Sequence, residues 1–399
     1  MTFFYKFFGR DFLVSVLIVV NICFFSFTGS LAQQTGEYVS RAQQVILIDA
    51  DTGAVLYQFN ADDLVPPASL TKLMTLEVLF KALKEGQVKL QDEFTVSANA
   101  WKTGGAPSKT PTMFLPPKSK VRVDDLIQGI IVQSANDASI TVAEGLAKTE
   151  TEFAKIMQSE ARRIGMKRSI FKNSTGLFNP EHLMSARDLA LLSLHLISEY
   201  PEHYKLFSQT EFSYGKHKFY NRNPLLAENL GVDGLKTGSS KEAGFGMAFS
   251  AYRNGKRLVG VVLGLKDDNQ RRDEARRLLE WGQKSFARFT IFHSDEVIGR
   301  ARVWGGSKWY TPLTGKGGDL TIVLPRYPAN QKLKAEIIYQ SPLKPPMRKG
   351  DEVGMLRVTS SSNATTEVPL VAMEDVERGW VWSRGVDSLI FLFLRWANL

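Results

Sequence analysis

The sequence predicts an α+β domain that is followed by a small all-β domain. Three observations predict this fold class: apolar residues recur at helical spacing in residues 70–84 and 124–200, strand-like alternation begins at Gly234, and short alternating segments separated by glycine and proline fill residues 291–372. The chain has 399 residues, of which 44% are hydrophobic and 23% charged. Such a chain can bury cores in about two or three domains, which excludes a disordered or fibrous protein.

An export signal is predicted at residues 1–32. Basic residues precede an apolar run at residues 12–27, and small side chains at residues 30–32 suit a signal peptidase. The alternative is a retained N-terminal membrane anchor, although the run is short for a spanning helix of ~20 residues. Either interpretation places the body of the protein outside the cytoplasm.

Composition and charge exclude several kinds of chemistry. The only cysteine, Cys23, lies within the predicted signal, so a mature chain would contain no disulfide, catalytic thiolate or cysteine-bound metal. The histidines form no metal-binding motif, and neither a metal nor another cofactor is expected. The net charge of +9 favours anionic membrane or wall polymers as partners, whereas nucleic-acid binding is not expected of an exported chain.

The predicted first domain, residues 37–288, begins with a β-hairpin. Residues 45–49 and 54–58 are predicted to be strands, and they flank a turn that contains Gly53. The helical spacing at 70–84 is apolar enough to predict a largely buried helix.

The second half of this domain is predicted to supply antiparallel strands. Strand-like residues 245–252 and 257–265 flank Asn254-Gly255, which is a strong signal for a two-residue hairpin. A helix at about residues 273–286 would pack on this sheet.

Two further segments follow, a small β domain at residues 291–372 and an amphipathic helix at residues 380–399. Several large apolar side chains of the last segment share one helical face, among them Trp382, Leu389 and Phe393. At 1.5 Å per residue, about 16 helical residues reach only ~24 Å, which is short of a ~30 Å hydrocarbon core. We therefore expect this helix to lie in the membrane interface, and the alternative is a helix that docks on its own domain or on a partner.

A hydroxyl and an amine lie three residues apart at the beginning of the predicted buried helix. In Ser69-Leu-Thr-Lys72 both side chains project from the same helical face. A serine needs a nearby base in order to attack an amide, and a lysine whose charge is disfavoured by burial can be that base. Many helices contain this S-x-x-K pattern by chance, so alone it is weak evidence.

Two more short patterns follow downstream. Ser134-Ala-Asn136 offers a hydroxyl that can relay a proton and an amide that can hold both Lys72 and a substrate carbonyl. In Lys236-Thr237-Gly238, on a predicted strand, the ammonium would attract a substrate carboxylate and disfavour a proton on Lys72, and the glycine would let a peptide backbone approach the strand. A chance joint occurrence of all three patterns in this order is far rarer than any single match.

These patterns and their surroundings resemble those of the D-alanyl-D-alanine carboxypeptidases among the low-molecular-mass penicillin-binding proteins. The matching stretches are residues 67–75, 134–139, 171–177 and 232–238, and the resemblance covers nearly the whole predicted mature chain. It implies a serine β-lactamase/penicillin-binding-protein-like transpeptidase domain, a small all-β domain and a C-terminal amphipathic helix. It also implies removal of the terminal D-alanine from peptidoglycan stem peptides, with β-lactam antibiotics as covalent inhibitors.

The resemblance implies catalytic roles for five residues. Ser69 would be the nucleophile and Lys72 its general base. Ser134 and Asn136 would be the proton-relay and orienting pair, and Lys236 would act with its neighbour Thr237 in recognising the substrate carboxylate.

Substrate-binding roles are implied for further residues. Arg271 matches the family arginine that helps to hold the carboxylate, although the adjacent Arg272 is an alternative. The oxyanion would lie between the backbone N–H groups of Ser69 and Ser239. Many relatives have histidine after K-T-G where this chain has Ser239. The backbone N–H of residue 239 is the same in both cases, but we expect the reaction rate and the peptide preference to differ.

Three other functions could use the same patterns. A class A β-lactamase would need a deacylating carboxylate in an E-x-x-x-N run, and no glutamate between Asn136 and Lys236 has asparagine four residues later. A D-alanyl-D-alanine endopeptidase that cuts crosslinks is the nearest enzymatic alternative. A non-catalytic wall-binding or β-lactam-sensing protein is the alternative from another class, against which the intact Ser69 and Lys72 argue. In all cases we expect the protein at the periplasmic face of the bacterial inner membrane, peripherally anchored.

Overall fold

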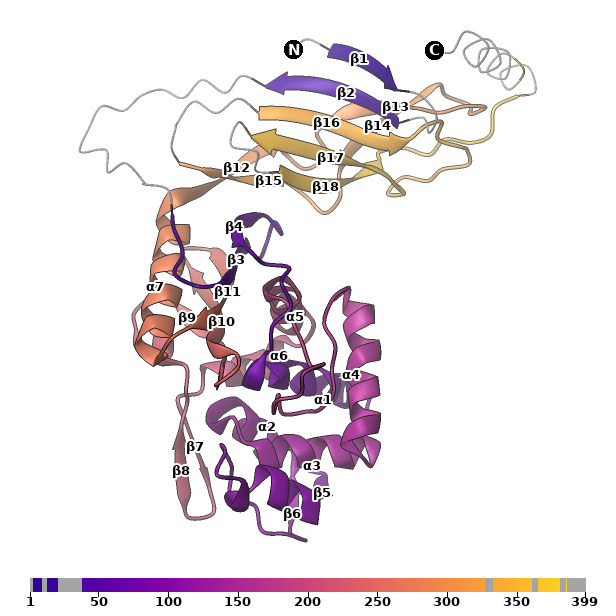
Figure 1. The fold of residues 1–399 in the computed structure, drawn as a ribbon. Coiled ribbons are helices and arrows are strands. Elements are labelled where there is room, and N and C mark those ends of the chain that lie inside the picture. The colour runs from indigo at the N-terminus through magenta and orange to yellow at the C-terminus, as the bar shows by residue number, and fades with distance from the viewer. Residues whose placement is uncertain are drawn as a thin grey trace. The chain divides into compact units, whose positions relative to one another are not determined.

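The structure, a computed structural model, separates into two compact units (Figure 1). It describes residues 3–8, 13–20, 38–326, 333–360, 365–380 and 385. The larger unit comprises residues 37–51 and 55–284, and the smaller unit comprises residues 1–36, 52–54 and 285–399. Each unit has its own hydrophobic core.

An antiparallel sheet of five strands forms the centre of the larger unit. The strand order is β4-β3-β11-β10-β9, so β9 lies at one edge. The bounds are Gln44–Asp49 for β3, Val55–Phe59 for β4, Val232–Ser240 for β9, Gly244–Arg253 for β10 and Lys256–Leu265 for β11. The hairpins predicted at β3–β4 and β10–β11 are confirmed, and Asn254 and Gly255 form the turn of the second with φ angles of 52° and 72°.

Helices cover both faces of this sheet, with α7 on one face and the remaining helices on the other (Figure 1). The bounds are Lys72–Lys84 for α1, Val123–Gln128 for α2, Asn136–Ala147 for α3, Glu150–Ile164 for α4, Ala186–Glu199 for α5, Pro201–Tyr204 for α6 and Asp268–Ser285 for α7. Two small antiparallel sheets complete the unit: β5 Glu93–Thr95 pairs with β6 Lys120–Arg122, and β7 Glu211–Tyr214 and β8 His217–Tyr220 form a hairpin. The sequence did not predict either pairing.

Alternation along each strand directs the two faces of the sheet to two separate cores. In β3, Ile46 and Ile48 pack with the helical core, whereas Val45 and Leu47 pack in the core that contains α7. Because β3 is buried on both faces, its sequence is a continuous apolar run.

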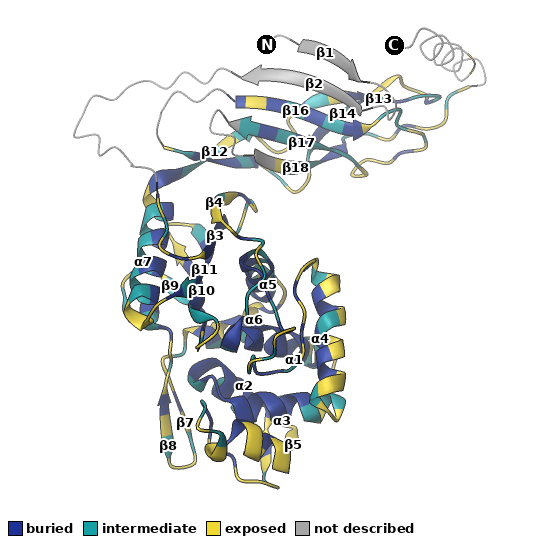
Figure 2. Cartoon of the chain, viewed as in Figure 1, coloured by how far each residue is buried: buried dark blue, intermediate teal, exposed yellow. Residues whose placement is uncertain are grey.

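Helix α1 is buried on nearly every side (Figure 2). Its side chains Leu73, Leu76 and Leu79 are 0% exposed, and burying each contributes about 1.5–3 kcal/mol. A short 3₁₀ turn, Ala68–Thr71, leads directly into this helix. The first turn of α1 is therefore anchored rigidly in the core, and Ser69 lies immediately before it.

The smaller unit is built from strands. One sheet has the order β1-β2-β16-β17-β18-β14-β13, and β12 pairs with β15. The bounds are Phe3–Phe8 for β1, Leu13–Val20 for β2, Phe286–Phe292 for β12, Gly299–Arg302 for β13, Tyr310–Gly315 for β14, Leu320–Pro325 for β15, Leu333–Gln340 for β16, Glu352–Ser360 for β17 and Thr365–Ala372 for β18. This unit begins before the expected residue 291 because α7 continues directly into β12. Strands β1 and β2 fall within the predicted export signal.

The predicted helix at residues 380–399 lies outside the described residues, apart from Trp380 and Gly385. Trp380 is 80% exposed. Among the helices that the structure describes, none has the length and apolar character required to cross a membrane.

Candidate active site

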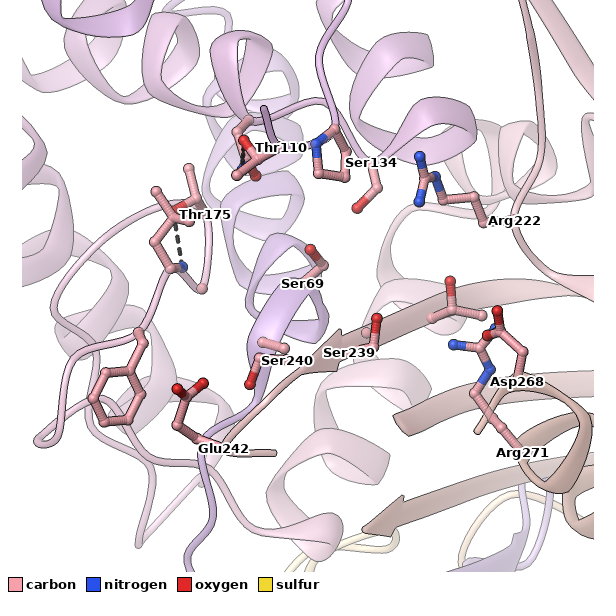
Figure 3. A pocket seen from close by; sticks show the side chains of 18 residues that line it. Ser69, Thr110, Ser134, Thr175, Arg222, Ser239, Ser240, Glu242, Asp268 and Arg271 are labelled. Atoms are coloured by element: carbon pink, nitrogen blue, oxygen red, sulfur yellow. Dashed lines mark hydrogen bonds and ion pairs between the residues drawn. The ribbon is translucent and has the colours of Figure 1, made fainter. Parts of the chain in front are cut away.

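A pocket of about 680 Å³ beside the beginning of α1 brings the three sequence patterns together (Figure 3). The predicted site residues that line it are Ser69, Ser134, Asn136, Thr237, Gly238, Ser239 and Arg271. Lys72 and Lys236 are buried, with 0% and 2% of their surfaces exposed. The spatial convergence that the sequence patterns predicted is therefore present.

The amine of Lys72 contacts the hydroxyl of Ser69. The Nζ atom lies 3.0 Å from Ser69 Oγ and donates a second hydrogen bond, of 2.7 Å, to the backbone carbonyl of Thr175. Because Ser69 belongs to the 3₁₀ turn and Lys72 is the first residue of α1, the anchored helix holds both groups in place. A hydroxyl in contact with an amine is the arrangement that an activated serine requires.

The pKa of Lys72 is lowered from 10.5 to about 7. Burial is the largest cause, and the positive charge of Arg222 is the next, whereas Glu150 and Asp137 act in the opposite direction. At neutral pH a substantial fraction of Lys72 is thus uncharged and able to accept a proton.

Lys236 and Lys72 disfavour each other's positive charge, because repulsion between two like charges is mutual. The pKa of Lys236 is lowered well below 10.5, first by burial and then by the charge of Lys72, with smaller effects of Arg222 and Arg271. Arg222, which no sequence pattern had identified, is a further cation that lowers the pKa of Lys72. This accumulation of positive charge favours the binding of an anionic group.

A loop at residues 173–177 supplies the second partner of Lys72. The Asn173 side chain accepts hydrogen bonds from the backbone N–H groups of Thr175 and Gly176, at 3.2 and 2.7 Å. Gly176 has a φ of +80°, and a Cβ atom there would lie 1.8 Å from the carbonyl oxygen of Ala68. Only glycine allows the loop to pass so close to the Ser69 turn.

The Ser134 hydroxyl has no hydrogen-bond partner among the described residues, although it is buried. Ser134 adopts the left-handed conformation, with φ 62° and ψ 33°, between the helical turn Gly129–Gln133 and α3. A strained backbone and an unpaired buried hydroxyl are both unfavourable, and such features concentrate at functional sites.

Asn136 differs in part from the expectation. We expected its amide to hold Lys72, but the amide nitrogen donates a 2.8 Å hydrogen bond to Thr110 Oγ1, and the Oδ1 atom is buried without a partner in the described chain. The expected contact between Asn136 and Lys72 is therefore not among the hydrogen bonds of the described residues. The free Oδ1 remains available to a substrate donor.

The carboxylate of Asp137 secures the pocket wall next to Asn136. It accepts hydrogen bonds from the Thr112 hydroxyl at 2.5 Å and from the backbone N–H groups of Met113 and Leu115 at 3.0 and 3.1 Å. Burial raises the pKa of this carboxyl group. No sequence pattern assigned Asp137 a role, because its partners lie more than 20 residues away in the chain.

The structure distinguishes Arg271 from Arg272. Arg271 is 5% exposed, lines the pocket and forms a 2.5 Å ion pair with Asp268. The Arg272 side chain is 42% exposed and pairs with Asp273 instead. Consecutive helical residues point about 100° apart, so only one of the two can face the pocket.

Gly238 allows close packing within the chain itself. A Cβ atom there would lie 3.1 Å from the backbone oxygen of Pro67 and from the backbone nitrogen of Leu70. Gly238 therefore lets the Ser69 turn pack closely against β9, and the approach of a substrate backbone to this strand stays a prediction.

Arg222 and Glu242 also line the pocket, and no sequence pattern had identified them. Arg222 follows β8, and Glu242 lies in the turn between β9 and β10. In Figure 3, Arg222 and Arg271 lie to one side of Ser69 and Glu242 lies to the other. The pocket therefore has a cationic end and an anionic end, with the serine between them.

A second cluster of chemically active groups lies away from this pocket. Donor atoms of Glu77, Glu160 and His195 lie within 4.8 Å of one another. Glu160 is already paired with Lys81 and Arg163, and a Glu77 oxygen accepts a hydrogen bond from Tyr200. The positively charged side chains of Lys81 and Arg163 already pair with these carboxylates, so we interpret the cluster as an ion-pair network.

Comparison with known proteins identifies two family models along the chain. Residues 31–267 match a model described as D-alanyl-D-alanine carboxypeptidase. Residues 286–378 match a model described as the C-terminal domain of penicillin-binding protein 5. The two matches follow the division of the chain into its two units.

Individual relatives are similar over most of their length. The chain is 38% identical to D-alanyl-D-alanine carboxypeptidase DacC of Escherichia coli (strain K12), over 93% of this chain and 94% of the relative. Its structure resembles that of penicillin-binding protein 5 from Haemophilus influenzae, with a TM-score of 0.76, 33% identity and coverage of 86% and 99% of the two chains. It also resembles the ampicillin-bound form of penicillin-binding protein D2 from Listeria monocytogenes, with a TM-score of 0.53, 30% identity and coverage of 61% and 98%.

Proposed function

Because the chain belongs to the D-alanyl-D-alanine carboxypeptidase family, we infer that it removes the terminal D-alanine from peptidoglycan stem peptides through an acyl-enzyme on Ser69. The observation that carries this assignment is the 3.0 Å contact between Ser69 Oγ and a buried Lys72 whose pKa is about 7. A serine in contact with an amine that is uncharged in a substantial fraction of molecules can lose its proton as it attacks a carbonyl carbon.

Acylation proceeds by attack of Ser69 Oγ on the amide between the two D-alanines. Lys72 takes the hydroxyl proton as the new C–O bond forms, and backbone N–H groups of Ser69 and Ser239 stabilise the oxyanion. The C–N bond then breaks, and the departing amine receives a proton through the unpartnered hydroxyl of Ser134. Water hydrolyses the resulting ester and restores Ser69.

The cationic end of the pocket suits the terminal carboxylate of the substrate. Arg222 and Arg271 line it, and Lys236 lies buried beside Thr237. An arriving carboxylate favours the charged form of Lys236, because an opposite charge offsets the cost of burial. The negative charge of the substrate thereby offsets the positive charge at this end of the pocket.

The pH dependence of acylation should report the pKa of Lys72. This residue serves as a base only when it is unprotonated, so the acylation rate should rise from about pH 6 to about pH 8 with a midpoint near 7. Stopped-flow measurement of acylation by a chromogenic β-lactam gives this profile directly. A rate that is flat across this range would contradict Lys72 as the base.

The function is tested with two substrates. Purified protein in detergent is incubated with a peptide that ends in D-Ala-D-Ala and, separately, with a crosslinked peptide dimer. D-alanine release from the first and no cleavage of the second supports a carboxypeptidase. Preferential cleavage of the dimer would favour the endopeptidase, and covalent labelling by penicillin without cleavage of either substrate would favour a β-lactam-sensing protein.

Covalent inhibition by β-lactams follows from the same site. Ampicillin-bound and cefotaxime-bound forms of penicillin-binding protein D2 from Listeria monocytogenes are similar to the larger unit at 30% identity. A β-lactam carries a carboxylate and a strained amide, and these correspond to the carboxylate and the cleaved bond of the peptide. We propose that Ser69 is the acylated residue.

Export and peripheral membrane attachment complete the proposal. Removal of residues 1–32 would release the mature chain to the periplasmic face of the bacterial inner membrane, and the segment at 380–399 would attach it there. Deleting residues 380–399 should then release an active enzyme into the soluble fraction, which fractionation combined with the D-alanine assay measures. Continued membrane retention of the truncated protein would locate the anchor elsewhere.

A further inference from the structure

The anionic end of the pocket has no part in the proposed reaction. Glu242 lines this end, is exposed, and forms no ion pair or hydrogen bond through its side chain within the described chain. The other lining carboxylate, Asp268, is neutralised by its 2.5 Å ion pair with Arg271. Glu242 is therefore the pocket carboxylate whose charge remains available to a ligand.

The turn that carries Glu242 has a defined conformation. The backbone N–H of Ala243 donates a 3.0 Å hydrogen bond to the Ser240 hydroxyl, and Gly244 pairs with Ser240 across the strands. Gly244 has a φ of +64°, and a Cβ atom there would lie 2.7 Å from the carbonyl oxygen of Leu265. The short connection between β9 and β10 thus presents Glu242 at the end of the edge strand that lines the pocket.

The orientation of the substrate determines which of its residues meets Glu242. In the proposed reaction the terminal carboxylate binds at the end that contains Arg222 and Arg271, and the cleaved bond lies at Ser69. Glu242 lies on the opposite side of Ser69 from these arginines (Figure 3). The remainder of the peptide must then extend away from these arginines, toward Ser240 and Glu242. The second-to-last residue is D-alanine, whose methyl group carries no charge, so the third residue from the end is the first that can place a charged side chain there.

We propose that Glu242 forms a subsite for an ammonium group on the residue that precedes D-Ala-D-Ala. Phe178 lines the same pocket and is 57% exposed, so it offers an apolar surface for the methylene groups of such a side chain. The preferred substrate is a stem peptide whose third residue from the end is a diamino acid with a free amino group. This inference rests on the proposed function, because it takes its orientation from the carboxylate site and Ser69.

The test compares two peptides that differ only in charge at this position. Nα-acetyl-Lys-D-Ala-D-Ala has a free side-chain amine, and Nα,Nε-diacetyl-Lys-D-Ala-D-Ala has that amine blocked. For the unaltered enzyme we expect kcat/KM to be about two- to fivefold higher for the free amine, the range typical of an exposed ion pair. This ratio should fall as salt is added.

Variants at the turn assign the preference to one side chain. In Glu242→Gln the ratio of the two kcat/KM values should fall to about one, and in Glu242→Lys it should fall below one. The matched control is Lys241→Gln, because Lys241 is exposed next to Glu242 but does not line the pocket; its ratio should remain that of the unaltered enzyme.

Failure of this inference is distinguishable from failure of the proposed function. If the unaltered enzyme releases D-alanine from both peptides with equal kcat/KM, or if Glu242→Gln keeps the preference, the subsite is refuted and the carboxypeptidase stands. If neither peptide loses D-alanine, the function itself is refuted.

Discussion

Replacement of Ser69 by alanine is expected to abolish both D-alanine release and covalent labelling by penicillin. The substitution removes the hydroxyl oxygen that forms the ester, while Lys72 and the rest of the pocket remain in place. Ser69 is half-buried in a turn and its hydroxyl contacts Lys72, so loss of this one side-chain contact should leave the fold intact. Peptide cleavage, gel fluorescence with a labelled penicillin and thermal unfolding measure the three quantities.

The control for this variant is Ser198→Ala. Ser198 is an exposed residue of α5 whose hydroxyl contacts the backbone of His195, away from the pocket. It should retain full labelling and cleavage. Retained labelling in Ser69→Ala would mean that another hydroxyl is acylated, and retained cleavage would refute the covalent mechanism.

Replacement of Lys72 by methionine should lower kcat/KM by about 10²- to 10⁴-fold, the contribution typical of a general base. Methionine has a similar length and is apolar, so it suits a position that is 0% exposed. The main structural cost is the unpaired carbonyl of Thr175, about 1–3 kcal/mol. The rate of penicillin acylation should fall with peptide cleavage, and the rise in rate near pH 7 should disappear.

Lys84→Met on the same helix is the matched control. The Lys84 side chain is 54% exposed and forms a surface ion pair with Glu199, which contributes at most about 1 kcal/mol. This variant should keep both the rate and its pH profile. If the acylation rate of Lys72→Met still rises with pH near 7, a different group must accept the proton from Ser69.

Local sequence signals predicted the elements whose stability is largely local. Asn254-Gly255 predicted the β10–β11 hairpin because both residues readily adopt the positive φ that its turn requires. Apolar residues at helical spacing predicted α1. Because these residues lie on nearly all sides of the helix, they also predicted its burial. The start of β12 at Phe286 was not predicted, since this strand depends on pairing with β15 elsewhere in the smaller unit.

The same distinction holds within the active site. Ser69 and Lys72 could be recognised because one turn of helix places them on one face. Thr175 could not, because it lies 103 residues from Lys72 and reaches it only through the loop that Gly176 allows. Arg222 and Glu242 belong to a loop and a turn without a motif, and only folding brings them to the pocket.

What the sequence by itself determined is the chemistry available to this protein: a serine, a nearby lysine, two further polar patterns and the order in which they occur. What only the tertiary structure decided is the protonation of those groups and which side chains face the pocket. A pKa of about 7 for Lys72 results from complete burial and from the charge of Arg222, and the choice of Arg271 over Arg272 results from the orientation of α7. Both are consequences of through-space distance and solvent exclusion, which short motifs do not encode.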